Sequence, residues 1–280
     1  MNGQSFTKMH GLGNDFVVLD GRDGALAIGE ADARAIGNRR TGVGFDQLLI
    51  LQPARNGAAD LFMRIMNPDG SEAEACGNGT RCVAAKVMDE IGRDILNIET
   101  VAGVLETQRG ADGLVTVDMG PANLDWADIP LAEACDTLHL GIKNGALIDP
   151  VAINMGNPHM VFFVDDAESV DLAELGPALE HHPLYPERTN VEVVSLLGPD
   201  RVRMRVWERG AGITLACGSG ACAAGVAAHR RGLTGRRIKV ILDGGPLGIE
   251  WRDDGHVLMT GPVATSFEGH LAPSLLNGEG

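Results

Sequence analysis

The chain of 280 residues is long enough for one large domain or two of ordinary size. Hydrophobic residues make up 44% of it and aromatic residues only 4%, and its 38 glycines predict close backbone packing and many turns. The formal net charge of −15 argues against a nucleic-acid or anionic-membrane partner, because both require a basic surface.

The chain shows no targeting or metal-binding pattern. Residues 1–16 contain no apolar core of signal-peptide length, and no stretch resembles a membrane span, so we expect a cytoplasmic protein. The five cysteines are odd in number and have neither CxxC nor zinc-ligand spacing. We therefore expect thiols rather than a disulfide framework, and no metal.

The first half is predicted to be rich in strands. Extended segments are expected in four places: residues 6–21, 45–53, 60–70 and 96–120. A short helix is expected over residues 31–38. A second is expected over residues 80–92, because Val83, Val87 and Met88 lie on one helical face and Gly92 can end the helix.

The second half repeats this scheme. Extended segments are expected at residues 151–166, 190–210 and 238–262, and a helix at residues 172–181. Residues 221–232 form a further expected helix, whose small residues on every side indicate burial. The repeat predicts a duplicated α/β unit with a boundary near Pro121.

Two short stretches share one pattern: EACGNGTRC at residues 74–82 and LACGSGACA at residues 215–223. Each places Cys, Gly, a polar residue and Gly before an expected buried helix. A helix N-terminus presents backbone amides and a positive dipole end, which favours a thiolate there. Two such turns facing each other would bind one carboxylate and leave a thiol on each side of the neighbouring carbon. That arrangement suits stereoinversion at a carbon α to a carboxylate, with one thiolate removing a proton and the opposite thiol supplying one.

A cysteine is most often a small buried residue, and Cys82, Cys135 and Cys222 keep that interpretation. For Cys76 and Cys217 the paired context favours chemistry, and a reversible disulfide between them remains a rival interpretation.

Several blocks in the chain resemble the diaminopimelate epimerase family, which is independent of cofactors. The blocks are KMHGLGNDF, NRRTGVGFDQ, NPDGSEAEACGNGTRC, GNPHMVFFV, ERTNVEVV and ERGAGITLACGSGACA. Ser219 stands where the family more often has Thr, and Ile213 where a polar residue is commoner. Asn78 stands where proline-racemase relatives carry His, which favours the epimerase resemblance.

The resemblance implies an α/β (α+β) fold of two pseudo-symmetric domains, each a barrel-like, mostly antiparallel sheet around a central helix. One domain would comprise residues 1–120 plus 266–280 and carry Cys76, and the other would comprise residues 121–265 and carry Cys217. The resemblance also implies a homodimer, a small-molecule amino-acid substrate and no cofactor.

The site residues follow position by position from the same resemblance. Cys76 and Cys217 match the two catalytic thiols, and His159 and Glu208 match residues that assist the reacting centre. The positions that match substrate-binding residues are Asn14, Gln47, Asn67, Gly77, Asn78, Asn157, Asn190, Glu208, Arg209, Gly218 and Ser219. This set offers acceptors for ammonium groups and donors for carboxylates.

The function implied is the interconversion of LL- and meso-2,6-diaminopimelate in lysine and peptidoglycan-precursor biosynthesis. Two alternatives stay open on the sequence: a racemase of another amino acid on the same scaffold, and a thiol-based redox or binding protein.

Overall fold

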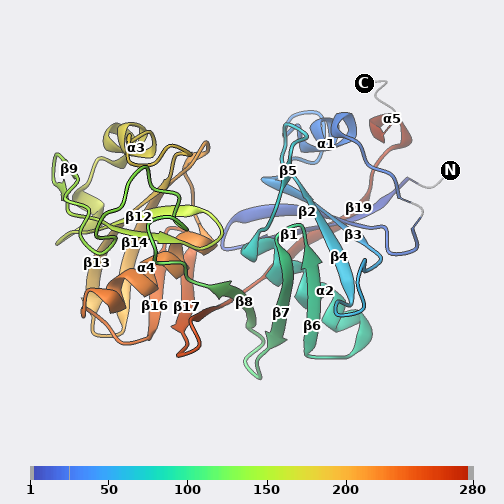
Figure 1. The fold of residues 1–280 in the computed structure, drawn as a ribbon. Coiled ribbons are helices and arrows are strands. Elements are labelled where there is room, and N and C mark those ends of the chain that lie inside the picture. The colour runs from blue at the N-terminus through green and yellow to red at the C-terminus, as the bar shows by residue number, and fades with distance from the viewer. Residues whose placement is uncertain (1–2, 25, 277–280) are drawn as a thin grey trace. The chain divides into compact units, whose positions relative to one another are not determined.

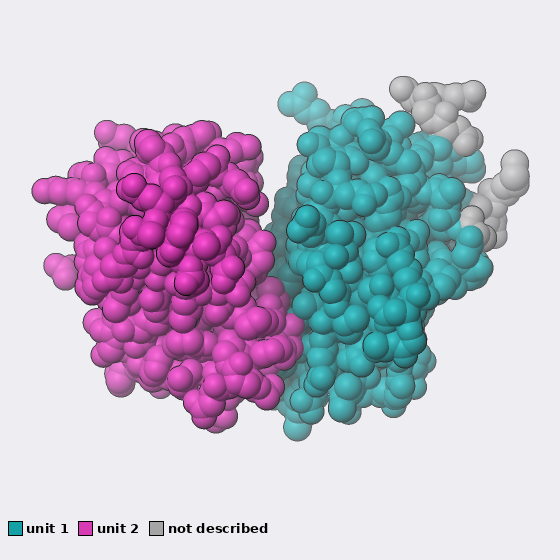
Figure 2. Space-filling model, viewed as in Figure 1, with its two compact units in different colours: residues 1–117, 261–280 teal, residues 118–260 magenta. Residues whose placement is uncertain are grey.

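The computed structural model describes residues 3–24 and 26–276 of the chain. Contacts divide the chain into two compact units (Figure 2). Unit 1 takes in the residues up to Val117 and those from Gly261 onward, and unit 2 takes in Asp118–Thr260. The C-terminal segment therefore folds with the N-terminal part of the chain.

Unit 1 is a mixed sheet around one long helix (Figure 1). Its strands are β1 (Ser5–Gly11), β2 (Asn14–Asp20), β3 (Gln47–Gln52), β4 (Leu61–Met66), β5 (Glu72–Ala73), β6 (Ile95–Thr100), β7 (Gly103–Arg109), β8 (Val115–Pro121) and β19 (Ala264–His270). Its helices are α1 (Glu30–Gly37), α2 (Gly77–Ile91) and α5 (Pro273–Leu276). Strand β8 runs across the division between the units.

Unit 2 contains the remaining elements. Its strands are β9 (Lys143–Asn144), β10 (Leu147–Ile148), β11 (Val151–Asn154), β12 (Pro158–Phe163), β13 (Asn190–Gly198), β14 (Arg201–Glu208), β15 (Gly212–Ile213), β16 (Arg237–Leu242), β17 (Gly245–Trp251) and β18 (His256–Gly261). Its helices are the 3₁₀ turn η1 (Ala167–Ser169), α3 (Leu172–Glu180) and α4 (Gly218–Arg230).

The two units share one pattern of strand pairing. In unit 1, β1–β2 is antiparallel, β2–β3 parallel, β3–β4 antiparallel, β4–β6 parallel and β6–β7 antiparallel. In unit 2, the pairs β11–β12, β12–β13, β13–β14, β14–β16 and β16–β17 follow the same alternation. The internal repeat seen in the sequence is thus a repeat of topology, and the predicted mixed α/β fold class is confirmed.

Helices α2 and α4 occupy equivalent places in this scheme. Helix α2 packs against β1, β6 and β7, and α4 packs against β11, β16 and β17 of its own unit (Figure 1). The small side chains of α4 are buried from Ala221 to Ala228, as their composition predicted, because a helix surrounded by strands has no face for polar groups.

The helices expected at residues 31–38 and 172–181 are confirmed as α1 and α3. The two helices after the thiol turns begin three residues earlier than the sequence predicted, at Gly77 and Gly218. The Cys-Gly-polar-Gly segments are therefore first helical turns. The sequence analysis also missed the two-residue strands β5, β9, β10 and β15, which are too short to show a periodic pattern.

Candidate active site

Cys76 is the N-cap residue of α2. Its backbone is extended (φ −152°), and its sulfur accepts a hydrogen bond from the Gly79 amide at 3.3 Å. The first helical bond, from the Thr80 amide to the Cys76 carbonyl, measures 2.8 Å. The thiol is half-buried and lies at the positive end of the helix.

Cys217 occupies the matching place at the start of α4. Its sulfur accepts from the Gly220 amide at 3.4 Å and lies 3.6 Å from the Ser219 hydroxyl. The residue is only 4% exposed. Burial raises the pKa of the Cys217 thiol well above its usual value, and the nearby carboxyl groups of Glu208 and Glu192 raise it further. This direction is opposite to the lowered pKa that the helix N-terminus predicted, because burial and the two carboxyl groups outweigh the helix dipole.

The two turns thus confirm that both cysteines lie at helix N-termini, and they place Gly77 and Gly218 as first helical residues. A β-carbon at Gly220 would lie 2.7 Å from Glu192 Oε1 and 3.2 Å from the Cys217 sulfur, so the second turn has no room for a larger residue. At Gly79 a β-carbon would lie 3.4 Å from the Cys76 sulfur, which is an ordinary contact distance.

Two predicted substrate-binding residues of unit 1 lie against each other beside the Cys76 turn. The side-chain amide of Asn78 donates to Asn14 Oδ1 at 3.1 Å, and Asn14 Nδ2 donates to Asp46 at 2.9 Å. The predicted residues Gln47 and Asn67 form a second pair, joined at 3.3 Å.

A cluster of charges supports the Asn14–Asn78 pair. Lys8 and Arg39 both bind the carboxylate of Asp15, and Arg39 also binds Asp46 at 2.8 Å. Burial by itself raises the pKa of Asp15, but the hydrogen bonds and charges of Arg39 and Lys8 outweigh it and lower the pKa to about 2. The two carboxylates next to the Asn14–Asn78 pair, Asp15 and Asp46, are therefore both paired with cations.

In unit 2 the structure joins His159 to Asn157 and to a residue that the sequence analysis did not select. His159 Nε2 lies 2.9 Å from Asn157 Oδ1, and Nδ1 lies 2.6 Å from Oε1 of Glu192. The side chains of His159 and Glu192 are fully buried. A charged residue in the middle of the apolar stretch NVEVV is the signal that could have found Glu192, because such a residue needs a buried partner.

Two further predicted residues of unit 2, Asn190 and Arg209, are joined by a hydrogen bond. Asn190 donates to the Pro158 carbonyl at 3.0 Å and accepts from the Arg209 amide at 2.9 Å. The guanidinium of Arg209 donates to the Glu187 carbonyl at 3.1 Å. The Asn157 and Asn190 side chains are thereby both tied to the strand that carries His159.

Glu208 ends β14 and accepts a hydrogen bond from the Thr214 hydroxyl. Burial raises the pKa of the Glu208 carboxyl; hydrogen bonds from Thr214 and Cys217 work against this, while the like charge of Glu192 adds to it. Within unit 2, the charge of Glu192 thus affects the pKa of both the Glu208 carboxyl and the Cys217 thiol. The imidazole of His159 also affects the pKa of Glu208.

The other three cysteines lie outside these turns. Cys82 and Cys222 are fully buried, as predicted, and burial raises the pKa of the Cys82 thiol to about 12. Cys135 is half-buried rather than buried, and its pKa is raised by burial and by Glu133 and Asp136.

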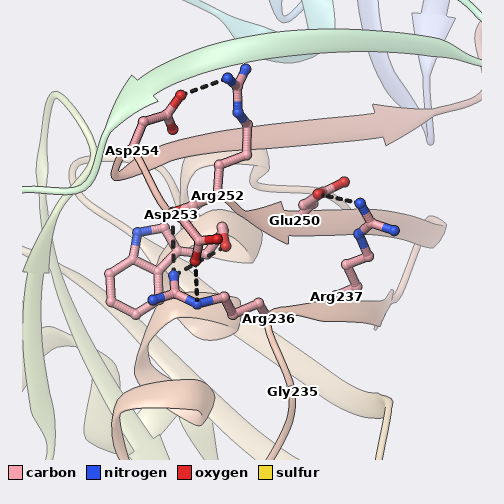
Figure 3. Close-up of a pocket in the computed structure, with 8 residues that line it drawn as sticks. Gly235, Arg236, Arg237, Glu250, Arg252, Asp253 and Asp254 are labelled. Carbon is pink, nitrogen blue, oxygen red and sulfur yellow. Dashed lines mark hydrogen bonds and ion pairs between the residues drawn. The ribbon is translucent and has the colours of Figure 1, made fainter.

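A surface pocket of about 760 Å³ on unit 2 contains none of the predicted site residues (Figure 3). Its three arginines each face an acidic partner: Arg236 lies 3.4 Å from Asp253, and the other two pairs are Arg237–Glu250 and Arg252–Asp254. The charges of these side chains therefore sum to zero.

In the described part of the chain, no group of three or more His, Cys, Asp or Glu side chains is arranged to hold a metal ion. Among the same residues, none of the helices has the length and apolar character that crossing a membrane requires.

Comparison with known proteins relates the chain to one family. A family model described as diaminopimelate epimerase matches residues 6–124 and 151–266. The diaminopimelate epimerase of Rhodospirillum centenum is 64% identical, with 98% of this chain and 94% of that protein covered. The enzyme of the same name from Acidiphilium cryptum is 55% identical, with 97% of each chain covered.

Solved structures of more distant proteins share the fold. A phenazine biosynthesis protein of the PhzF family from Bacillus anthracis has a TM-score of 0.70 at 17% identity, with 97% of this chain and 100% of that chain covered. A probable proline racemase from Agrobacterium radiobacter has a TM-score of 0.69 at 17% identity, with 97% and 95% covered. At this identity the likeness concerns the fold alone. The family match over most of the chain, together with relatives above half identity along nearly its whole length, shows that this chain belongs to the diaminopimelate epimerase family.

Proposed function

We propose that the protein interconverts LL- and meso-2,6-diaminopimelate, the reaction named by the relatives it matches from end to end. The observation that carries the proposal is the pair of cysteine N-caps at equivalent places in two units of equal topology. The reaction would supply a precursor of lysine and peptidoglycan and would take place in the cytoplasm.

Each unit acts in this proposal as one epimerase domain that contributes one thiol. Cys76 and Cys217 approach opposite sides of the substrate α-carbon; the thiolate removes the α-proton and the opposing thiol delivers a proton to the other face. The high pKa that burial gives the Cys217 thiol suits the proton donor in the resting enzyme. In the reverse direction the two groups exchange roles.

The carbanion formed between the two steps needs stabilisation by fixed dipoles. The first turns of α2 and α4, at Gly77-Asn78 and Gly218-Ser219, direct backbone amides toward the reacting carboxylate in this proposal. The mechanism requires no cofactor in this proposal, because helix N-termini would stabilise the charge that develops on the carboxylate.

The polar residues around each turn bind the rest of the substrate. Amide oxygens and the Glu208 carboxylate accept hydrogen bonds from the ammonium groups, and Arg209 and the amide nitrogens donate to the distal carboxylate. The amide residues assigned this role are Asn14, Gln47, Asn67, Asn78, Asn157 and Asn190. We also propose that the working molecule is a homodimer, whose mass light scattering would give directly.

The decisive assay is incorporation of solvent deuterium at the α-carbon of diaminopimelate. We expect Cys76→Ser and Cys217→Ser each to reduce conversion by at least about 10²-fold, because each removes a proton-transfer group. Cys135→Ser is the matched control, since it removes a thiol outside the two turns and should keep the wild-type rate.

Three results would contradict the proposal. Full conversion by the Cys76→Ser, Cys217→Ser double variant would remove the two-thiol mechanism. Faster turnover of amino acids that lack the distal groups would favour a racemase of another substrate. A Cys76–Cys217 disulfide with no isotope exchange after reduction would favour a redox or binding protein.

A further inference from the structure

Glu192 and His159 form a buried pair on the unit 2 sheet. Strands β12 and β13 are parallel, and His159 pairs with Asn190, so Glu192, two residues further along, lies on the same face of the sheet. That face packs against α4, whose N-cap is Cys217. The Glu192–His159 contact is 2.6 Å long between two side chains with no exposed surface.

The pair determines which ring nitrogen of His159 carries a proton. A carboxylate oxygen only accepts hydrogen bonds, so Nδ1, which faces Glu192 Oε1, carries the hydrogen. Nε2 lies 2.9 Å from Asn157 Oδ1, which also only accepts, so in this arrangement Nε2 carries a hydrogen as well, and a neutral ring requires the Asn157 amide turned to present its Nδ2. The imidazole is therefore oriented from one side by Glu192 and from the other by Asn157.

Fold stability does not account for Glu192. Within residues 3–24 and 26–276, its second carboxylate oxygen, Oε2, is buried and has no hydrogen-bond partner. A buried ion pair is commonly no more stabilising than apolar residues of similar volume, because the charges lose their hydration. A carboxylate kept at this position with His159 as its bonded partner indicates a role exercised through the histidine.

Glu192 also reaches the Cys217 turn. A β-carbon built at Gly220 would lie only 2.7 Å from Glu192 Oε1, so the carboxylate lies directly against the first turn of α4. The titratable groups around Glu192 come from four elements: His159 of β12, Tyr185 before β13, Glu208 of β14 and Cys217 at α4. The negative charge of Glu192 opposes ionisation of the Cys217 thiol.

We propose that Glu192 is a positioning residue that acts through His159: its carboxylate holds the proton on Nδ1 and presents the Nε2 edge of the ring to Asn157. The same carboxylate favours the protonated form of Cys217. The proposal rests on the proposed function, since the orientation of His159 affects the rate only where an α-carbon is bound at this site.

Two substitutions separate the charge of Glu192 from its hydrogen bond. Glu192→Gln keeps an oxygen that can accept from Nδ1–H but removes the charge, and Glu192→Met removes both at similar volume. Glu192→Gln keeps the hydrogen bond to Nδ1 and should fold. Glu192→Met removes one partner of a buried pair, which is destabilising, so its fold is checked by circular dichroism, and the charge test is carried by Glu192→Gln if Glu192→Met does not fold. Glu180→Gln is the matched control, because Glu180 is another buried carboxylate of unit 2 and bonds Trp207 at 2.7 Å.

The first readout does not depend on activity. Nitrogen NMR of the full chain with ¹⁵N-labelled histidine reports the tautomer of each imidazole, and His159→Gln identifies the His159 signal. We expect a proton on Nδ1 of His159 in the wild type and in Glu192→Gln, and its loss in favour of the Nε2–H form in Glu192→Met. An imidazole without a proton on Nδ1 in the wild type, or an unchanged Nδ1 signal in Glu192→Met, would overturn the proposal.

The second readout is the pH dependence of kcat/KM in both reaction directions. In the reaction direction in which Cys217 is the base, its deprotonation sets the acid limb of the pH profile of kcat/KM. In the opposite direction Cys217 is the acid, and its deprotonation sets the basic limb. Removing the Glu192 charge stabilises the thiolate, so both limbs should move to lower pH in both variants. Glu192→Met should also lower kcat by about 10- to 100-fold with little change in KM, because a misoriented His159 assists the reacting centre less well.

The results of these experiments distinguish a failure of this proposal from a failure of the proposed function. Lower activity with unmoved limbs would show that Glu192 acts structurally and would overturn the proposal. Wild-type protein that exchanges no deuterium into diaminopimelate would refute the function, while the NMR experiment would still decide whether Glu192 fixes the His159 tautomer. Glu180→Gln should leave the tautomer and both limbs in place.

Discussion

The two thiol turns tolerate an added methyl group to different extents, which gives a direct test of their packing. Gly220→Ala places a carbon 2.7 Å from Glu192 Oε1 and 3.2 Å from the Cys217 sulfur. The equivalent change in unit 1, Gly79→Ala, places a carbon 3.0 Å from the end of the Leu49 side chain. Glu192 is fully buried and bonded to His159, whereas Leu49, which is also fully buried, meets the added carbon with the end of a side chain that makes no hydrogen bond.

The magnitudes follow from these contacts. Overpacking a core costs about 1–3 kcal/mol, and we expect Gly220→Ala to incur it because the Glu192 carboxylate is fully buried and bonded to His159. Replacing a helical glycine by alanine increases the free energy of unfolding by up to about 1 kcal/mol, because alanine has the higher helix propensity. The net change is a destabilisation of about 1–2 kcal/mol for Gly220→Ala and close to zero for Gly79→Ala.

Urea denaturation of the two variants and the wild type measures this difference. Because the chain has two compact units, intrinsic fluorescence and far-UV circular dichroism should be followed together to reveal separate transitions. Equal stability of Gly220→Ala and the wild type would refute the close approach of Glu192 to α4. Equal destabilisation by both substitutions would refute the contrast between a hydrogen-bonded carboxylate and a leucine side chain that makes no hydrogen bond.

Two further predictions concern unit 1. Asp46→Ala removes the acceptor that orients Asn14, so we expect KM for diaminopimelate to rise severalfold with a smaller change in kcat, measured by steady-state kinetics. Asp15 is bound by Lys8 and Arg39 and has a pKa of about 2 in place of 3.8, so its ionised form stabilises the fold above pH 3.8 and this stabilisation is lost as the pH falls toward 2. The unfolding free energy of wild type minus that of Asp15→Asn should therefore be largest above about pH 4 and shrink in acid; a difference independent of pH would contradict the assignment.

The local structure at the two thiols could be predicted from the sequence. A cysteine followed by Gly-polar-Gly and a run of helix-forming residues defines a helix start, because an N-cap and the amide it accepts from are only three residues apart. The same local rule explains the end of α2 at Gly92, which has a positive φ of 67°. Both helices begin three residues earlier than predicted, because the glycine segment, whose composition is typical of a turn, is already helical.

The environment of each thiol was decided by tertiary structure. His159 and Glu192 are 33 residues apart in the chain, and the register of two parallel strands brings them together. Asp46 reaches Asn14 across 32 residues in the same way.

Sequence alone determined the fold class, the duplicated thiol turns and the family, because these depend on local periodicity and on motifs in a fixed order. Only the tertiary structure decided that Cys217 is buried beside two carboxyl groups, that its pKa is raised and that His159 is paired with Glu192. Burial and electrostatic interactions depend on which side chains meet in space, and many sequences with the same local pattern would pair them differently.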